Sequence, residues 1–227
     1  MGTFTATGTL KTRWWGSASD ANSAQAGQGK NTSVGGDGGL VGIINFSNIA
    51  NFDWSKAVTS IKLTFTNHNW TGSTGTKEIN FHYSKIQNFN ANSRGNEYLG
   101  TTSGEDTSSL MGTVTSSLSA NTAFSITLSK TSNSALFNKM LAYFKTKGNT
   151  ILCLYKYENI LSGKTYSENF FMLNAASITI TYQDAIIYYG TSSGWKPCLM
   201  YYGTSSGWKQ VIPYYGTSSS WKQIGGT

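Results

Sequence analysis

The sequence predicts an all-β protein, in which a β-sandwich with one short helix precedes a C-terminal tail of β repeats. The chain has 30 Ser, 29 Thr and 19 Asn, 78 of its 227 residues, and these side chains compete with helical backbone hydrogen bonds. Short segments alternate apolar and polar residues, and a 13-residue unit recurs three times near the C-terminus. Charged residues are only 12%, which argues against a coiled coil or a highly charged disordered chain.

Period-two alternation marks the expected strands of the sandwich. Such a pattern is typical of antiparallel strands with one buried face. It covers residues 61–66, 79–83, 124–128 and 178–182, and further strands are expected at 3–10, 40–46, 150–157 and 169–173. Eight or more strands with Gly-, Ser- and Asn-rich connections predict a β-sandwich.

One helix is expected among these strands. Leu136, Phe137, Met140, Leu141 and Phe144 fall on one face at helical spacing. Asn133 or Ser134 is suited to the N-terminal cap and Gly148 to the C-terminal end, so the helix is expected within 133–147. The apolar face predicts that it covers one end of the sandwich.

The tail begins at a break in composition near Asp184, which predicts a sandwich domain at 1–184 and a repeat tail at 185–227. Both prolines lie after the break, and no acidic residue does. The units read YYGTSSGWKPCLM (188–200), YYGTSSGWKQVIP (201–213) and YYGTSSSWKQIGG (214–226). Each unit holds a five-residue Gly/Thr/Ser turn followed by an eight-residue run such as 195–202, and the aromatic and β-branched residues that flank the turn predict a strand, a turn and a strand. Because short strands of this kind bury little, the tail must pack on the sandwich, on sister chains or on a partner.

Charge and cysteine content exclude several classes of protein. The net charge is +7, but no run of Lys or Arg occurs, so nucleic acid is not expected as a partner. Cys153 and Cys198 cannot make a disulfide framework, and Cys153 in an apolar run is expected to be a small buried side chain. No apolar stretch approaches membrane-spanning length, and the N-terminal residues lack the pattern of a signal peptide. Membrane insertion is therefore not expected.

Residues 15–183 resemble jelly-roll modules of the DNRLRE type and the related carbohydrate-binding jelly rolls. The resemblance rests on GGDGGLVGIINFS (35–47), AVTSIKLTF (57–65) and AASITITY (175–182), with the helix placed before the strand at 151–157. It implies a jelly-roll sandwich and a carbohydrate ligand. The chain lacks the acidic residue usual in the first strand pair of that group, so calcium and other cofactors are not expected.

The tail is similar to the short Trp-containing repeats that end many phage tail-fibre and head-fibre proteins. That resemblance implies a virion appendage, usually a homotrimer, which contacts other virion proteins and adheres to a host-surface glycan as receptor. Virion proteins leave the cell by lysis, which agrees with a surface-type composition. The choline-binding repeats of bacterial wall proteins also combine Gly-Trp with Tyr-Tyr, although their period is longer and their order differs.

Aromatic side chains are the expected ligand-binding groups, because flat apolar rings stack on sugars. In the tail they recur with a lysine, and identical groups at regular intervals suit multivalent binding; an assembly ladder between subunits is an equal alternative. These tail candidates are Tyr188, Tyr189, Trp195, Lys196, Tyr201, Tyr202, Trp208, Lys209, Tyr214, Tyr215, Trp221 and Lys222. In the sandwich the candidates are Trp14, Trp15, Trp54 and Trp70, with capping of the core as the alternative for each.

Catalytic and metal-binding signals are sparse. His68 and His82 lie at a strand end and on the polar face of a strand, so both are expected at the surface. Glu105 and Asp106 form an acidic pair in a loop, which is the basis for a third hypothesis, a glycan hydrolase. Asp20, Asp37 and that pair have oxygen ligands for Ca²⁺, but no ligand spacing recurs. We therefore expect a phage adhesion protein without enzymatic activity, and alternatively a bacterial cell-wall or glycan-binding module whose aromatic repeats hold the ligand.

Overall fold

The computed structural model describes residues 1–34, 39–183, 187–191, 194–198, 201–205, 207–210, 214–216 and 221–223. Beyond residue 183 it describes side chains only within 201–208. Strands dominate the first 183 residues, as the sequence predicts. Their bounds are β1 (Gly2–Thr7), β2 (Thr9–Trp14), β3 (Asp20–Asn22), β4 (Ala26–Lys30), β5 (Gly39–Asn45), β6 (Ala57–Asn67), β7 (Gly75–Tyr83), β8 (Leu110–Leu118), β9 (Ala123–Ser129), β10 (Ile151–Leu154) and β11 (Phe171–Gln183).

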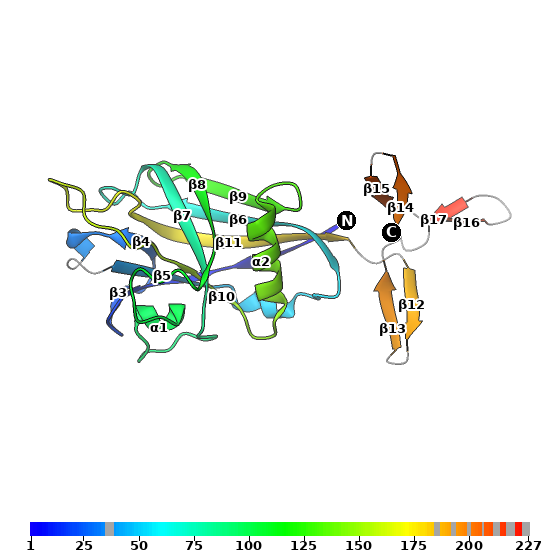
Figure 1. Ribbon diagram of the computed structural model, residues 1–227, viewed down its shortest axis with the longest axis horizontal. Helices are drawn as coiled ribbons and strands as arrows, with labels where there is room; N and C mark the ends of the chain where they lie inside the picture. Colours follow the sequence, from blue (N-terminus) through cyan, green and yellow to red (C-terminus); the bar gives the residue numbers. More distant parts are fainter. Residues whose placement is uncertain are drawn as a thin grey trace.

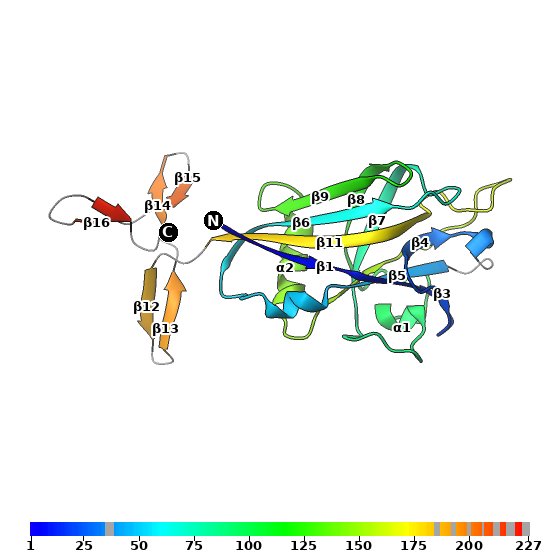
Figure 2. The same ribbon diagram turned by 180° about the vertical axis from the view of Figure 1, so that it is seen from behind.

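Two antiparallel layers form a β-sandwich, so the all-β prediction is confirmed (Figure 1). One layer has the order β1-β11-β6-β9, and the other has the order β8-β7-β10-β5-β2-β3. The layers are joined twice. The first connection is the N-terminal segment, in which β1 pairs with β11 and the following strand, β2, pairs with β5. The second is β4, which pairs with both β5 and β11. Figure 2 shows β1 running beside β11 toward β5.

The main core fills the space between the layers. Ile61, Leu63 and Phe65 of β6 point inward, while Lys62 between them is exposed. Ile178 and Ile180 of β11 join the same cluster, as do side chains from β5, β7 and β10. The period-two alternation therefore identified the inner face of β6 and β11 correctly.

Helix α2 (Ser134–Lys145) closes one side of the sandwich (Figure 1). β8 and β9 are the two ends of the strand order, and α2 packs against both of them. Leu136, Phe137, Met140 and Phe144 of the helix are buried in the main core. The predicted helix is confirmed, and it shields the two strand edges that would otherwise invite further pairing.

A second apolar cluster lies on the outer face of the layer that contains β5 and β10. Segment 84–109, which includes the short helix α1 (Gly95–Leu99), covers this face. Tyr98 and Leu99 of α1 pack against Val41, Ile43 and Cys153. The prediction that Cys153 is buried is confirmed, and burial raises the pKa of its thiol to about 12.

Several strand boundaries differ from the predictions. The strand expected at 3–10 is broken at Gly8, where a Cβ atom would lie 2.7 Å from Ile44 Cγ2. Residues 169–173 and 178–182 belong to one long strand, β11, and the strand expected at 150–157 ends at Leu154. β3, β4 and β8 were not expected. β4 contains Gly27, Gln28 and Gly29, whose composition carries no apolar alternation.

The sandwich also contains the short 3-10 helices η1 (Thr32–Val34) and η2 (Ser47–Asn51). No helix within the described residues is long and apolar enough to cross a membrane.

The repeats form three β-hairpins, which Figure 1 places beyond the end of β11. Their strands are β12 (Ile187–Thr191) with β13 (Gly194–Cys198), β14 (Tyr201–Thr204) with β15 (Gly207–Gln210), and β16 (Tyr214–Gly216) with β17 (Trp221–Gln223). The expected pattern of strand, turn and strand is confirmed in each unit. The run at 195–202 is not one strand, because β13 ends at Cys198 and β14 starts a new hairpin at Tyr201. The predicted five-residue turn is also too long, since its outer residues Gly190, Thr191 and Gly194 belong to the strands.

Candidate functional site

The four tryptophans of the sandwich lie in three different clusters. Trp14 and Trp70 pack with Tyr166 on Leu40, Phe170 and Met172. Trp15 stacks on Tyr155, with ring centroids 4.7 Å apart. Trp54 packs between Phe52 and Phe144 against the main core. All four are partly buried, so each contributes to packing with at least one face.

Trp70 has its indole nitrogen occupied. Its Nε1 donates to Gln25 Oε1 at 3.1 Å, and that oxygen also accepts from Asn22. The His68 ring lies 5.9 Å from the Trp70 ring, and His68 Nδ1 is shielded from solvent with no hydrogen bond in the described part of the chain. His68, which was expected at the surface, is partly buried, because its ring packs against the Trp70 ring. The Trp70 cluster holds the loops at this end of the sandwich together.

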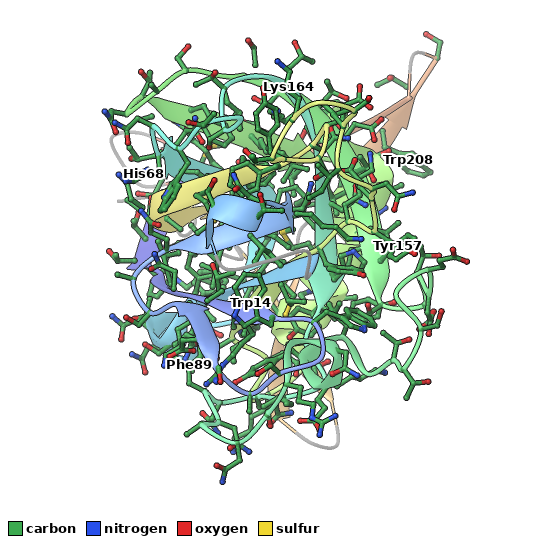
Figure 3. The ribbon with its side chains drawn as sticks, turned by 90° about the vertical axis from the view of Figure 1, so that its left-hand side faces the viewer. Trp14, His68, Phe89, Tyr157, Lys164 and Trp208 are labelled. Carbon is green, nitrogen blue, oxygen red and sulfur yellow. The ribbon has the colours of Figure 1, made fainter. Side chains whose placement is uncertain are left out.

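A hollow of about 310 Å³ lies on the outer face of the sandwich, where β7 and the residues after β10 meet the loop at 104–107. Its most exposed aromatic ring is Tyr157, which is 48% exposed. Polar side chains surround that ring, namely Asn80, Glu105, Asp106 and Lys156. Figure 3 looks at the end of the molecule away from the hairpins and shows Tyr157 to the right of Trp14.

We call this hollow the Tyr157 hollow. The loop at 104–107 is fixed against its floor. Tyr155 Oη donates a 3.0 Å hydrogen bond to the Gly104 carbonyl. A Cβ atom on Gly104 would lie 2.8 Å from Tyr157 Cδ2, so only glycine lets the loop approach the ring this closely. Lys30 Nζ stands 5.2 Å from the centre of the Tyr157 ring. The hollow is thus largely preformed, as binding sites for small molecules usually are.

Hydrogen-bond donors and acceptors both line the Tyr157 hollow. Asn80 Oδ1 accepts from Thr113 at 2.8 Å, which orients the amide and leaves its NH₂ group as a donor. Lys156 pairs with Glu78 and with Glu158, so its charge is largely compensated. Glu105 is exposed and offers carboxylate oxygens. The arrangement is one flat ring beside a donor amide and acceptor carboxylates.

His82 lies beneath this hollow and is buried, so its expected surface position is wrong. The side chain is 1% exposed, because segment 84–109 covers the outer face of β7. His82 Nε2 lies 3.0 Å from the Tyr155 carbonyl, which can only accept, so Nε2 carries the proton. Nδ1 then accepts from the Ser109 hydroxyl at 2.9 Å. Burial lowers the pKa of His82 to about 4, although the bond to Tyr155 opposes the shift.

The acidic pair does not have the pattern of a glycosidase acid and base. A general acid needs a raised pKa, and the two carboxyl groups must face each other across the sugar. The backbone N–H of Ser108 donates to Asp106 at 2.7 Å and helps to hold the pKa of that carboxyl below its usual range. His82 has both ring nitrogens engaged. The geometry here therefore suits binding better than proton transfer.

Metal ligands do not gather within the part of the chain that the structure describes. No three His, Cys, Asp or Glu side chains there lie close enough to hold an ion. Asp20 binds Arg13 instead, with Oδ1 3.0 Å from Nε, and Asp37 lies outside the described residues.

The three hairpins repeat one register. The Trp of each unit lies opposite a Gly, and the Lys lies opposite the second Tyr, as in the pairs Gly203–Trp208 and Tyr202–Lys209. Trp208 is 77% exposed and Tyr201 is 48% exposed. The backbone of the other tail candidates lies in these strands, but their side chains are outside the described residues: Tyr188, Tyr189, Trp195, Lys196, Tyr202, Lys209, Tyr214, Tyr215, Trp221 and Lys222.

No family model matches the chain, and no curated protein is similar to it in sequence. Tyr157 was not predicted from the sequence, because it follows an apolar strand and Tyr155 is the only aromatic residue near it in the sequence. The only available signal was the run YKYE at 155–158, in which aromatic and charged residues alternate.

Proposed function

We propose that this chain is an adhesion protein of a bacteriophage virion, a fibre or receptor-binding appendage that binds host-surface glycan without cleaving it. The observation that carries the proposal is the Tyr157 hollow. A sugar ring has an apolar face and a rim of hydroxyl groups, so it needs a flat ring beside polar side chains. The exposed ring of Tyr157, with Asn80 and Glu105 beside it, supplies both.

The hairpins support the virion part of the proposal. A two-stranded hairpin is marginally stable alone, and each of these pairs only within itself in the described residues. Trp208 is 77% exposed, so its ring is accessible to a sister chain. Three sister chains would cover the repeated rings, in agreement with the resemblance of the tail to phage-fibre repeats. The homotrimer, its contacts with other virion proteins and its location in the virion belong to this proposal.

Replacing Tyr157 by Ala is expected to weaken glycan binding about 10-fold or more, because the stacking surface disappears. A glycan array selects the ligand, and isothermal titration calorimetry on the full chain measures the affinity. Tyr157→Phe keeps the ring and should retain most of the affinity. Leu161→Ala removes an exposed apolar side chain outside the hollow and the hairpins and serves as the matched control.

Unchanged affinity in Tyr157→Ala would reject the Tyr157 hollow as the glycan site. The same glycan, incubated with the protein, should yield no new reducing ends. Turnover that disappears in Glu105→Gln or Asp106→Asn would establish the hydrolase hypothesis instead.

Replacing the three repeat tryptophans Trp195, Trp208 and Trp221 by Ser is expected to convert a trimer into monomers. The exposed position of Trp208 means that this change removes little intramolecular packing in its own hairpin. Analytical ultracentrifugation measures the mass, and circular dichroism confirms that the sandwich is folded. A wild-type chain that sediments as a monomer would contradict the assembly role.

The alternative, a bacterial cell-wall or glycan-binding module, is favoured by the same exposed tryptophan. Ligand held by the repeats would stack on Trp208 in place of a sister chain. Trp208→Ala would then abolish glycan binding and leave the sedimenting mass unchanged.

A further inference from the structure

A second hollow, of about 480 Å³, lies between α2 and the segment that follows β7. Tyr83 and Tyr143 line it, with ring centroids 5.9 Å apart and planes inclined by 31°. Lys85 and Lys139 line it as well, and no Asp or Glu does. Its charge is therefore opposite to that of the loop at the Tyr157 hollow, which carries two carboxylates.

Both lysines of this hollow have ammonium groups that the described residues leave unpaired. No hydrogen bond or ion pair engages Lys85 Nζ or Lys139 Nζ within the described part of the chain. Lys85 comes from the segment after β7 and Lys139 comes from α2, so the two lysines belong to different walls of the hollow. A Cβ atom on Gly100 would lie 2.4 Å from Lys85 Cγ, which shows that the stem of Lys85 packs along the end of α1.

The aromatic wall is held in place by hydrogen bonds. Tyr143 Oη donates to the Ile151 carbonyl at 2.7 Å and accepts from the Ser84 backbone N–H at 3.2 Å. Burial raises the pKa of Tyr143, so this hydroxyl stays protonated and the ring stays neutral. Asn149 Nδ2 donates to the Tyr143 carbonyl at 2.9 Å, and Gln87 lies within hydrogen-bonding distance of Asn149. Tyr83 Oη has no such bond in the described residues and is free to meet a ligand.

We propose that the hollow lined by Tyr83, Tyr143, Lys85 and Lys139 binds an anionic sugar unit, one that carries a carboxylate or a phosphate. This proposal rests on the proposed glycan-binding function and names the ligand class for a second site. The rings offer an apolar wall, the amides and Tyr83 offer hydrogen bonds, and the two ammonium groups offer charge-assisted bonds to the acidic substituent. Both lysines are exposed and form an ion pair only with the acidic unit, so that unit should bind more tightly than a neutral sugar.

The test uses the full chain and three probes, measured by titration calorimetry. The probes are an oligosaccharide of alternating glucuronic acid and N-acetylglucosamine, the same oligosaccharide with its carboxyl groups reduced to alcohols, and a sugar phosphate. Lys85→Met and Lys139→Met keep the apolar stems and remove the charges. Lys62→Met removes an exposed charge on β6 of the other layer and is the matched control.

Each lysine replacement is expected to weaken binding of the acidic probe about fivefold, the double replacement more, and Lys62→Met not at all. The reduced probe should bind equally to all of these variants. Preference for the carboxylate or for the phosphate probe identifies the acidic group. Tyr83→Phe should weaken binding of both sugar forms, since it removes only the hydroxyl.

Equal affinity of the wild type for the acidic and the reduced oligosaccharide would overturn the inference, as would an equal loss in Lys62→Met. If Tyr157→Ala abolishes glycan binding while Lys85→Met/Lys139→Met has no effect, this inference fails and the proposed function stands. If the acidic probe binds through the two lysines but Tyr157→Ala changes nothing, the Tyr157 hollow fails and this site stands. Absence of binding by all three probes would reject this inference and leave the Tyr157 hollow to its own test with the glycan that the array selects.

Discussion

Gly42→Ala is expected to cost about 3 kcal/mol of stability, because the added methyl group meets backbone rather than a flexible side chain. A Cβ atom at Gly42 would lie 2.7 Å from the Gly27 carbonyl oxygen and 2.9 Å from the Gly27 nitrogen. These atoms belong to β4, which pairs with β5 on one side and β11 on the other. The two layers join at this point, so the clash cannot be relieved by a side-chain rotation.

Urea unfolding followed by circular dichroism measures the loss for Gly42→Ala. Gly16→Ala is the matched control, since no heavy atom outside its chain neighbours lies within 4 Å of its added Cβ, and its stability should stay within about 0.5 kcal/mol of the wild type. A Gly42→Ala protein as stable as the control would show that β4 and β5 do not approach each other as described.

Acidification is expected to destabilise the protein through His82. In the unfolded chain this imidazole titrates near pH 6.5, and in the folded chain burial lowers its pKa to about 4. Below pH 6.5 the unfolded state therefore binds more protons than the folded state. The contribution of His82 is fully present above pH 6.5, is lost as the pH falls toward 4, and changes no further below that. The depression corresponds to about 3 kcal/mol.

The difference between wild type and His82→Gln isolates this effect from the carboxylates, which titrate in both proteins. Urea unfolding free energies, measured from pH 7.5 to pH 3.5, should fall more steeply for the wild type. His68→Gln is the control. It leaves the buried imidazole in place, so its unfolding free energy should depend on pH as steeply as that of the wild type. Parallel pH profiles for wild type and His82→Gln would mean that His82 is not buried in its neutral form.

The covering segment at 84–109 connects the fold to both hollows. It buries His82 and Cys153 on the outer face of the layer, and its loop at 104–107 forms one wall of the Tyr157 hollow. Lys85 and Gln87, at the start of the same segment, line the hollow beside α2. A sandwich face that is usually open to solvent is here converted into a second core with a hollow at each side.

The strands and the helix with clear periodicity were predictable from the sequence. β6, β7 and β9 follow the two-residue alternation, and α2 follows helical spacing, because each element has one face on the main core. β4 was not predicted because most of its buried residues are Gly and Gln, which form no hydrophobic pattern. β8 was not predicted for a related reason, since Gly112 and Ser116 share the inward face with Val114 and Leu118, and only Met111 and Leu118 of this strand are buried.

The candidate site was less predictable than the fold. The four tryptophans singled out for stacking all contribute to packing, and Trp54 lies against the main core between Phe52 and Phe144. Tyr157 became a candidate only through the tertiary structure, in which β10 ends at Leu154 and the residues after it line a hollow with the loop at 104–107. Local sequence does not encode which distant loop will stand beside a ring.

The sequence by itself determined the all-β class, the inner faces of the long strands, the helix and the 13-residue unit of the tail, because alternation and repetition are local patterns. Only the tertiary structure decided that the outer face of β7 and β10 is covered, that His82 is neutral and buried, and that Glu105 and Asp106 face Tyr157. Those outcomes depend on contacts such as His82 with Tyr155 and Gly42 with Gly27. Such contacts join residues far apart in the chain, and their free energy arises from burial that no local pattern records.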